Sequence, residues 1–246
     1  MLRGSPGTSP WRPVGVIGGM GPAATVDFLA RLVAATPATT DQEHIPVVVW
    51  GDPTVPDRVA AARGQDTSPV PWMRAGAQGL AHMGAEVLAV ACNTAHAFAA
   101  EATAGLGVEL VSMVDASAAA LAADGSAAGA RRVALFGTRG LVEAGLYQGA
   151  LASHRIETVV PDDARQEAVS ALILRVKAAE PLPGLVQELA GHVAAQADAG
   201  CTHALVACTE LSLLVTEAQR AGVTFALPVV DASDELARAV VRAAAR

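Results

Sequence analysis

Hydrophobic residues along this chain follow two alternating patterns. Short apolar runs at 14–18 (VGVIG), 45–50 (IPVVVW) and 86–91 (EVLAVA) contain almost no polar residue, which is typical of strands buried on both faces of a sheet. Longer alanine-rich stretches at 23–36 and 72–84 carry apolar residues with helical period. Short strands that alternate with helices predict βαβ units around a parallel sheet, so the fold class is α/β.

The chain also contains an internal repeat. Three pairs of similar segments occur in the same order: 14–22 (VGVIGGMGP) with 133–141 (VALFGTRGL), 84–92 (GAEVLAVAC) with 200–208 (GCTHALVAC), and 114–117 with 230–233, both VDAS. The last two pairs share one offset, and the first differs by only three residues, which a loop absorbs. We predict two similar halves, each with a Gly-containing first turn, a middle strand ending in Cys and a late strand ending in Val-Asp-Ala-Ser. The boundary falls at 113–131, which runs through a helix and a Gly/Ser linker.

Composition narrows the class of protein. Of the 246 residues, 52% are hydrophobic and 17% charged, which indicates a packed core rather than a disordered chain. No apolar run reaches the roughly 18 residues that span a bilayer. The start of the chain lacks the apolar segment of a signal peptide, so we expect 1–12 to be a loose extension on a cytoplasmic protein. Three cysteines are an odd number and predict thiols in a reducing compartment.

The charge pattern argues against nucleic acid as a partner. The formal net charge is −7, and the 17 Lys and Arg residues are scattered without a basic stripe. Binding of an anionic small molecule is still compatible with this charge, because one or two arginines inside a pocket reverse the local field.

Two cysteines occupy equivalent positions in the repeat. Ligands of open parallel sheets sit beyond the carboxyl ends of the strands, and Cys92 and Cys208 both lie at that edge of their own half. Each is followed by residues that can start a helix, 93–94 and 209–210, so we expect helix N–H groups to favour the thiolates and lower their pKa. If the halves face each other, the thiols approach one cleft from opposite sides. Cys201 lies at the wrong end of its strand and is interpreted as structural.

Two other interpretations of these residues involve a metal site and a hydrolase. A metal site of Cys201, His203 and Cys208 fails, because Cys208 lies at the far end of the strand from the other two and no fourth ligand is near. A Cys92/His96 hydrolase dyad is within reach, since positions four apart share a helix face. It leaves Cys208 unexplained and lacks a third orienting group, but it stays open.

The first turn, 18–24 (GGMGPAA), resembles a dinucleotide-binding turn only weakly. A Rossmann site also needs an acidic residue at the end of the second strand, whereas Asp41 precedes that strand and Asp52 lies too far along. Free backbone N–H groups in this turn favour a carboxylate instead, with Met20 and Gly21 as candidate substrate-binding residues.

Among the cations, Arg58 is the candidate ligand for a carboxylate. Arg58 follows Pro56-Asp57 at the carboxyl edge of the second strand, where a guanidinium can hold a carboxylate through two hydrogen bonds. Lys177, taken from the sequence alone, is interpreted as a solvated helix charge.

Several motifs resemble a known family: GVIGGMGPAAT, DQEHIPVV, PDR, ACNTAHAF and ACTE. Together with the two-half layout, they resemble the cofactor-independent aspartate/glutamate racemase superfamily, most closely its aspartate racemase branch, over residues 13–246. The resemblance implies two α/β domains related by a pseudo-two-fold axis, with the active site in the cleft between them. It also implies a homodimer and neither pyridoxal phosphate nor metal. In that family the late strands cross over, which gives a first domain of 1–112 plus 229–246 and a second of 113–228.

The resemblance also assigns roles to individual residues. It implies that Cys92 and Cys208 are the two acid/base groups, that Arg58 holds a substrate carboxylate, and that Lys177 has a similar task. Further candidate substrate-binding residues are Asn93, Thr94, Thr138, Thr209 and Glu210; Glu210 either tunes Cys208 or caps the helix. The family pattern around Thr138 usually has two more small hydroxyl residues, which are Leu141 and Ala144 here.

The expected function is therefore interconversion of L- and D-aspartate, or of a related acidic amino acid, by one thiolate base and one thiol acid. A maleate-isomerase-like or decarboxylase-like member of the superfamily, a non-catalytic binder of acidic amino acids and a Cys-dependent hydrolase are the alternatives. The sequence does not choose between aspartate, glutamate and another diacid.

Overall fold

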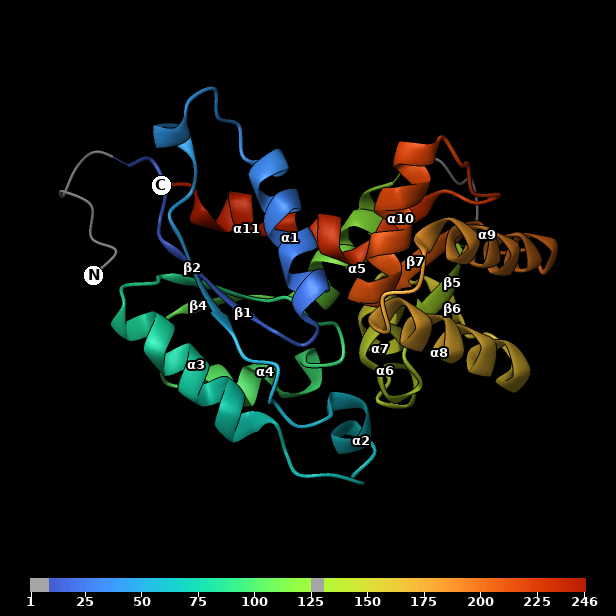
Figure 1. Ribbon diagram of the computed structural model, residues 1–246, viewed down its shortest axis with the longest axis horizontal. Helices are drawn as coiled ribbons and strands as arrows, with labels where there is room; N and C mark the ends of the chain where they lie inside the picture. Colours follow the sequence, from blue (N-terminus) through green and yellow to red (C-terminus); the bar gives the residue numbers. More distant parts are fainter. Residues whose placement is uncertain (1–8, 125–130) are drawn as a thin grey trace. The chain divides into compact units, whose positions relative to one another are not determined.

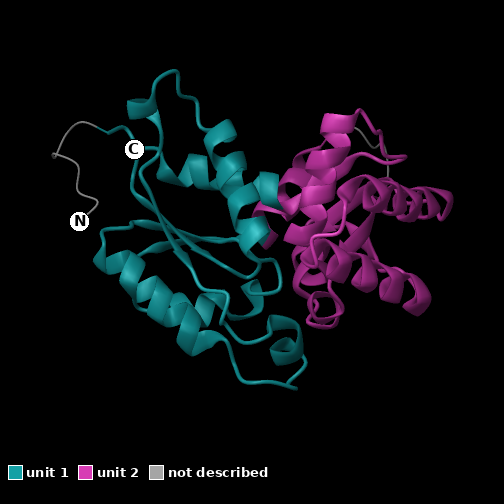
Figure 2. Cartoon of the chain, in the orientation of Figure 1, with its two compact units in different colours: residues 1–113, 233–246 teal, residues 114–232 magenta. Residues whose placement is uncertain are grey.

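The computed structural model describes residues 9–124 and 131–246 (Figure 1). Residues 1–8 of the expected extension and 125–130 of the expected linker lie outside the described residues. The chain divides into two compact units (Figure 2): unit 1 comprises 1–113 with 233–246, and unit 2 comprises 114–232.

Unit 1 alternates strands and helices as the hydrophobic pattern predicted. Its elements are β1 (Val14–Gly18), α1 (Pro22–Ala35), a 3₁₀ turn (Asp41–Glu43), β2 (Val47–Gly51), α2 (Arg58–Ala62), α3 (Val70–His82), β3 (Val87–Val90), α4 (His96–Thr103), β4 (Glu109–Val111) and α11 (Ala232–Ala244). The predicted segments at 14–18, 23–36, 45–50, 72–84 and 86–91 are confirmed, with ends that differ by one or two residues.

Unit 2 repeats this order. Its elements are α5 (Met113–Ala123), β5 (Arg132–Gly137), α6 (Arg139–Glu143), α7 (Leu146–Ser153), β6 (Glu157–Val159), α8 (Asp163–Lys177), α9 (Leu182–Asp198), β7 (His203–Ala207), α10 (Thr209–Ala221) and β8 (Val229–Asp231).

The two sheets have the same topology. Unit 1 has the strand order β2-β1-β3-β4 and unit 2 the order β6-β5-β7-β8, and every pairing is parallel. The α/β class and the internal repeat are therefore confirmed. Because all strands run the same way, the four carboxyl ends of each sheet lie at one edge, and that edge carries Cys92 in unit 1 and Cys208 in unit 2.

The central strands are buried on both faces, which explains their unbroken apolar sequence. Every residue of β1, β3 and β7 is buried. In unit 1, Ile17, Leu88 and Val90 pack with residues of α3 and α4, and α1 and α11 cover the opposite face (Figure 1). In unit 2, Phe136 and Val206 pack with residues of α8, α9 and α10.

Each late strand stays in the sheet of its own half. Strand β4 pairs with β3, and β8 pairs with β7, whereas the helices α5 and α11 that follow them continue into the other unit. The second boundary therefore lies at 232/233 instead of the expected 228/229, since 229–231 form β8 of unit 2.

The two VDAS copies do not end strands in the same way. Asp231 is the last residue of β8, as predicted for the second copy. In the first copy, β4 already ends at Val111, and Asp115 lies in the first turn of α5. The VDAS sequence is thus the same in both halves, but relative to it α5 begins three residues earlier than α11.

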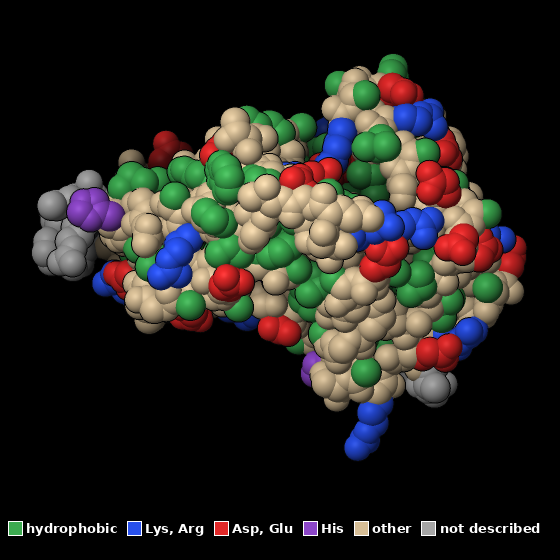
Figure 3. All heavy atoms as spheres, turned by 90° about the horizontal axis from the view of Figure 1, so that it is seen from below, with side chains coloured by type: hydrophobic (Ala, Val, Ile, Leu, Met, Phe, Trp, Pro, Cys, Tyr) green, Lys and Arg blue, Asp and Glu red, His purple; other side chains and the backbone are tan. Residues whose placement is uncertain are grey.

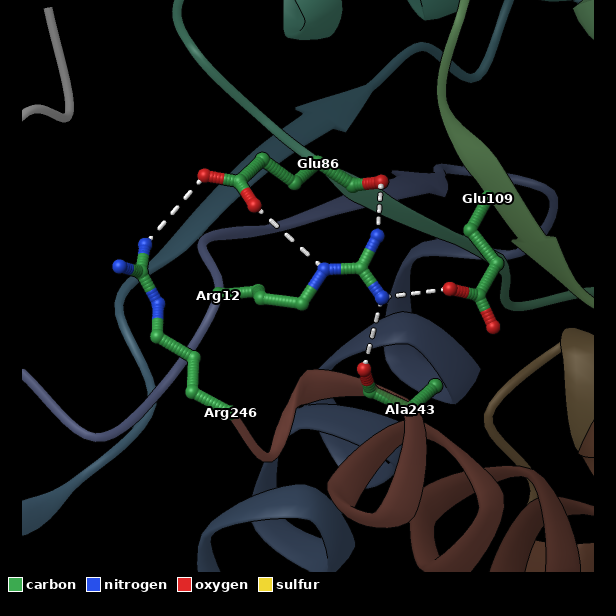
Figure 4. Close-up of polar contacts among 5 residues, drawn as sticks. All are labelled: Arg12, Glu86, Glu109, Ala243 and Arg246. Carbon is green, nitrogen blue, oxygen red and sulfur yellow. Dashed lines mark hydrogen bonds and ion pairs between the residues drawn. The ribbon is translucent and has the colours of Figure 1, made fainter.

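Helix α11 is tied to unit 1 by an ion-pair cluster at the amino-terminal edge of the sheet (Figure 4). The Arg12 guanidinium contacts the carboxylates of Glu86, before β3, and Glu109, in β4, and it donates to the Ala243 carbonyl of α11 at 3.0 Å. Arg246 pairs with the second oxygen of Glu86 at 3.4 Å. Hydrogen bonding to Glu109 raises the pKa of Arg12 further, so the cluster stays charged.

This cluster corrects the expectation that all of 1–12 is loose. Trp11 is buried and forms an antiparallel bridge with Ala245, and the Arg12 N–H donates to the Ala244 carbonyl at 2.7 Å. The segment before β1 is thus held against the end of α11.

No helix in residues 9–124 and 131–246 is long and apolar enough to cross a membrane. On the face drawn in Figure 3, Lys and Arg side chains are scattered among acidic and apolar ones.

Candidate functional site

In unit 1, three loops meet at the carboxyl edge of the sheet. The Ala91 N–H donates to the Ile17 carbonyl at 2.9 Å, which places the end of β3 beside the end of β1. Met20 from the first turn, Val55 from the loop after β2, and Cys92 all belong to one buried apolar cluster. The structure therefore brings the first turn, the segment before Arg58 and Cys92 together.

The first turn is held by glycine geometry and by one threonine. Gly19 has φ +88°, and a Cβ there would lie 2.4 Å from the backbone nitrogen of Asp52. The Gly19 N–H donates to Thr25 Oγ1 at 2.9 Å, and that hydroxyl donates to the Gly21 carbonyl at 2.9 Å. Gly21 is the N-cap of α1, with Pro22 as its first residue. Met20 and Gly21 thus form a fixed turn at the entrance to α1.

Arg58 is held at the start of α2. Asp57 caps this short helix, and the Arg58 Nη1 group donates to the carbonyls of Val55 and Pro56, both at 2.8 Å. The Arg58 Nε–H is buried and makes no hydrogen bond within the described part of the chain. A guanidinium fixed through one nitrogen keeps further donors for a carboxylate.

Cys92 is not at a helix start, in contrast to the prediction. Strand β3 ends at Val90, a turn covers 93–95, and α4 begins only at His96. Asn93 and Thr94 lie in that turn, and both are buried. The turn at 93–95 thus separates Cys92 from α4, and its polar residues Asn93 and Thr94 directly follow the thiol along the chain.

His96 is engaged by the backbone through both ring nitrogens. Its Nε2 accepts the Met113 N–H at 3.1 Å, so Nδ1 carries the proton and donates to the Cys92 carbonyl at 2.9 Å. A general base for the Cys92 thiol would need a free ring nitrogen. These two bonds argue against the Cys92/His96 hydrolase interpretation, because this imidazole joins the chain segments around Cys92 instead.

In unit 2, Cys208 is the N-cap of α10 and directly follows β7. The predicted helix start at Thr209-Glu210 is confirmed here. Cys208, Thr209 and Glu210 are all buried. This strand-to-helix junction is the counterpart of the Cys92 turn, but with a helix one residue away.

A carboxylate and a lysine accompany Cys208. The Cys208 thiol donates to Glu210 Oε2 at 3.2 Å, and the Thr209 hydroxyl lies 3.4 Å from the same oxygen. Lys177, the last residue of α8, has its Nζ 3.6 Å from Glu210 Oε1. The structure therefore brings together four of the predicted residues, and Glu210 contacts each of the other three.

The pKa of Cys208 is raised well above its usual value, in contrast to the predicted lowering. Burial is the largest cause, followed by the negative charge of Glu210 and by the hydrogen bond that Glu210 accepts from the thiol. Lys177 and the Glu210 backbone N–H act in the opposite direction but do not prevail. The helix start was predicted correctly, and so was the possibility that Glu210 tunes Cys208; the burial that dominates the shift was not part of the prediction.

Thr138 lies at the carboxyl end of β5 and caps α6. Its hydroxyl accepts the Leu141 N–H at 3.2 Å. The Leu141 side chain is buried and lies against Gly137, where a Cβ would be 2.9 Å from it, while Ala144 is exposed at the end of α6. Leu141 thus fills the core where the resembling family has a hydroxyl residue.

A buried polar group behind Cys208 was missed in the sequence. The Ser212 hydroxyl of α10 donates to Asp231 Oδ1 at 2.6 Å, and both residues are buried. Tyr147 of α7 is completely buried and hydrogen-bonded to Ser117 of α5. Ser117 and Asp231 belong to the two VDAS copies, so the repeated motif itself was the available signal.

The third cysteine lies apart from these groups. Cys201 precedes β7, at the opposite edge of the sheet from Cys208, and its thiol lies 3.8 Å from the Gln196 side-chain oxygen. Within residues 9–124 and 131–246, no group of three His, Cys, Asp or Glu side chains is placed to hold a metal ion.

The known proteins that this chain resembles include racemases. The family model described as Asp/Glu/Hydantoin racemase matches residues 17–240. The broad-specificity amino-acid racemase RacX of Bacillus subtilis (strain 168) is 24% identical over 237 residues, which is 93% of this chain and 96% of RacX. Among solved structures, aspartate racemase of Picrophilus torridus is 31% identical with a TM-score of 0.77 and 94% of each chain covered.

The fold is also that of an aspartate racemase homologue from Pyrococcus horikoshii OT3, at 21% identity, a TM-score of 0.73, and coverage of 96% of this chain and 100% of that one. Because the family model spans nearly the whole chain, including both cysteine edges, and the Picrophilus enzyme agrees with it in sequence and fold, this protein belongs to the Asp/Glu/hydantoin racemase family and is an isomerase.

Proposed function

We propose that this racemase inverts the Cα centre of acidic amino acids, with aspartate as the first candidate, and that Cys92 and Cys208 are its acid/base pair. The observation that carries the proposal is the pairing of the repeat: each similarly built unit has one buried thiol at the carboxyl edge of its third strand. A racemase needs two matched proton carriers, and a repeated unit supplies one each.

The reaction removes a proton from one face of Cα and returns a proton to the other face. One thiolate accepts the proton, one thiol donates, and the roles exchange with the hand of the substrate. The mechanism requires both sulfur atoms to reach the same Cα. Since the pKa of Cys208 is raised, Cys208 rests as a thiol, and in our proposal it is the acid when Cys92 is the base. The two thiols titrate as a coupled pair, because ionisation of one opposes that of the other.

The carbanion formed at Cα places negative charge on the substrate's α-carboxylate, which needs positioned donors. We assign this task to the polar groups that follow the two cysteines, Asn93 and Thr94 in unit 1 and Thr209 in unit 2. All three are buried, so water screens their dipoles little. Met20 and Gly21 offer a further fixed turn in unit 1, and Thr138 has a similar place in unit 2.

Substrate choice is assigned to the two cations. Arg58 retains donors beyond those used on its own loop, and Lys177 has a side chain that is 40% exposed at the end of α8. Both can hold the side-chain carboxylate of a diacid. The Picrophilus relative is an aspartate racemase and RacX a broad-specificity one, so the substrate panel must be wider than aspartate.

The test is incubation of the protein with L-aspartate, L-glutamate and a panel of other L-amino acids in D₂O. We expect the D-enantiomer to accumulate together with deuterium at Cα. Neither inversion nor exchange with any amino acid would overturn the racemase proposal. Release of CO₂ would indicate the decarboxylase alternative and conversion of maleate the isomerase alternative, while heat of binding without turnover would indicate a non-catalytic binder.

A cytoplasmic location is part of the proposal. The mechanism uses cysteine in the thiol form, and Cys92, Cys201 and Cys208 are thiols here, which a reducing compartment maintains. Immunodetection after cell fractionation tests it, and recovery mainly outside the cytoplasmic fraction contradicts it.

A homodimer is the proposed assembly, as the family resemblance implies. Light scattering coupled to size-exclusion chromatography should give a mass twice that of the chain. A mass equal to one chain at micromolar concentration contradicts a stable dimer.

A further inference from the structure

Glu210 is the only residue of the candidate site in unit 2 that contacts both a proton carrier and a cation among the described residues. Its side chain is 7% exposed, one carboxylate oxygen accepts the Cys208 thiol proton at 3.2 Å, and the other lies 3.6 Å from Lys177 Nζ. The distance to Lys177 is longer than a hydrogen bond, and Oε1 is buried with no hydrogen bond in the described chain. Lys177 is thus the main neutralising group for a nearly desolvated carboxylate.

Lys177 is also the more exposed partner. Its side chain is 40% exposed and it is the last residue of α8, whereas Glu210 lies in the first turn of α10. An exposed ammonium ion at 3.6 Å gains little from the pair and can exchange it for another carboxylate. A dicarboxylate ligand would compete with Glu210 for this cation.

Withdrawal of Lys177 changes what Glu210 does to Cys208. A carboxylate with a cation beside it shares its negative charge, while the same carboxylate without one is a stronger hydrogen-bond acceptor. We propose that Glu210 couples the Lys177 ion pair to the hydrogen bond of the Cys208 thiol, so that a carboxylate ligand that draws Lys177 away makes Cys208 hold its proton more firmly. Glu210 is thereby a positioning residue that keeps Cys208 in the protonated thiol form when a diacid is bound.

Other titratable groups surround this junction but are arranged differently. Tyr147 of α7 is within electrostatic range of Cys208 and is itself hydrogen-bonded to Ser117. Asp231 at the end of β8 is bonded to Ser212. Among the hydrogen bonds and ion pairs given for the described residues, Glu210 alone has both the thiol and the lysine as partners.

The inference rests on the proposed function for the identity of the ligand, but its test needs no turnover. A Cys92→Ser, Cys201→Ser protein labelled with ¹³C at cysteine Cβ gives one signal, from Cys208, whose position reports thiol or thiolate across a pH series. Glu210→Gln should move the midpoint to lower pH and Lys177→Met to higher pH, each by about half a pH unit or more. Arg175→Met is the matched control, because Arg175 on the same helix pairs with Glu180 and Glu188 instead.

Succinate, a dicarboxylate without an α-ammonium group, is the ligand probe, with acetate at matched ionic strength as its control. Succinate should raise the midpoint in the labelled parent protein, and most of that rise should vanish in the Glu210→Gln variant. An equal rise in both proteins means that the ligand's charge acts directly on the thiol and overturns the coupling. Unchanged midpoints in the Lys177→Met protein also overturn it; this surface substitution keeps the test open if Glu210→Gln does not fold.

The outcomes separate the coupling from the racemase proposal. The coupling alone is rejected if the unmodified protein racemises its substrate but the Cys208 midpoint is unchanged by Glu210→Gln and Lys177→Met. Coupled midpoints in a protein that racemises nothing reject the proposed function alone.

Discussion

Some groups around Cys208 raise the pKa of its thiol and others lower it, and the sequence alone does not predict which effect is larger. The helix N-terminus was predicted from Thr209-Glu210 and is present, yet Glu210 accepts the thiol proton and the junction is buried. A motif shows which groups are adjacent along the chain. Burial depends on how α8 and α10 pack, and this three-dimensional property decides the direction of the pKa shift.

The three cysteines give a comparison with an internal control. Cys92→Ser and Cys208→Ser should each lower kcat/KM for racemisation by about 10²–10⁴-fold, since a serine hydroxyl is a far weaker acid than a thiol and does not ionise to a base near neutral pH. Cys201→Ser should leave kcat/KM within about twofold, because Cys201 lies at the opposite edge of the sheet from Cys208. Chiral chromatography of aspartate measures all three.

Full activity in the Cys208 variant contradicts a two-thiol mechanism, even where racemisation itself is established. Loss of activity in the Cys201 variant, with unchanged thermal unfolding, would contradict the placement of the active site at the carboxyl edge of the sheet.

At the scale of elements, most strands and helices could be predicted from the sequence because the hydrophobic pattern matches the burial of these residues in the fold. Unbroken apolar runs became β1, β3 and β7, which are covered on both faces. The failures lie where a junction is decided by packing: α4 begins three residues later than predicted, and β4 ends before the VDAS motif. Hydrophobic period does not specify the turn residues that separate a strand from its helix.

Gly19 and Gly64 offer a test of how tightly the first turn is built. Both have positive φ, +88° and +69°, so alanine costs about 1 kcal/mol at either from backbone strain. At Gly19 a Cβ also meets the Asp52 backbone at 2.4 Å, whereas at Gly64 nothing lies within 4 Å. We expect Gly19→Ala to lower the unfolding free energy by at least about 2 kcal/mol and Gly64→Ala by about 1 kcal/mol.

Urea denaturation of the two variants measures these differences. Equal losses would show that the close approach of the first turn to the loop after β2 does not contribute to stability.

A buried hydrogen bond joins α10 to β8 in unit 2. Ser212→Ala removes the donor to Asp231 at 2.6 Å and leaves a buried carboxylate oxygen without it, so we expect a loss of about 1–3 kcal/mol. Ser170→Ala is the control, since that hydroxyl donates to the Gln166 carbonyl of its own helix, and it should cost less than about 0.5 kcal/mol. Chemical unfolding compares them, and similar values for the two serines contradict a structural role for the Ser212 bond.

At the scale of the whole molecule, the repeat was the most informative feature of the sequence. Two sheets with identical strand order follow from it directly. The boundary was harder to locate, because the resemblance placed the late strand in the other domain, whereas β8 pairs with β7 and only α11 continues into unit 1. Backbone pairing in a sheet joins residues far apart in sequence, and local pattern does not reveal it.

Global stability should fall at alkaline pH through Tyr147. Burial raises the pKa of this phenol above its usual value near 10, so above that pH the unfolded chain loses a proton that the folded chain retains. The contribution is complete below pH 10 and is lost as the pH rises beyond it. Urea midpoints should therefore decline above about pH 10, and less steeply in Tyr147→Phe, whose intrinsic cost is about 1 kcal/mol for the lost bond with Ser117.

Tyr147 is the single tyrosine of the chain, so the difference between the two pH profiles reports this residue alone. Parallel profiles for the two proteins contradict the assignment.

The anchoring of α11 by Arg12 has a consequence for the order in which the protein can mature on the ribosome. Unit 2 is one continuous stretch and can close as soon as β8 has been synthesised, whereas the sheet of unit 1, although made first, must wait for α11. During that interval Trp11 and Arg12 lack their partners at the end of α11, and the surface that α11 later occupies remains open to water and to other nascent chains. The half of the enzyme that is translated first is thus completed last.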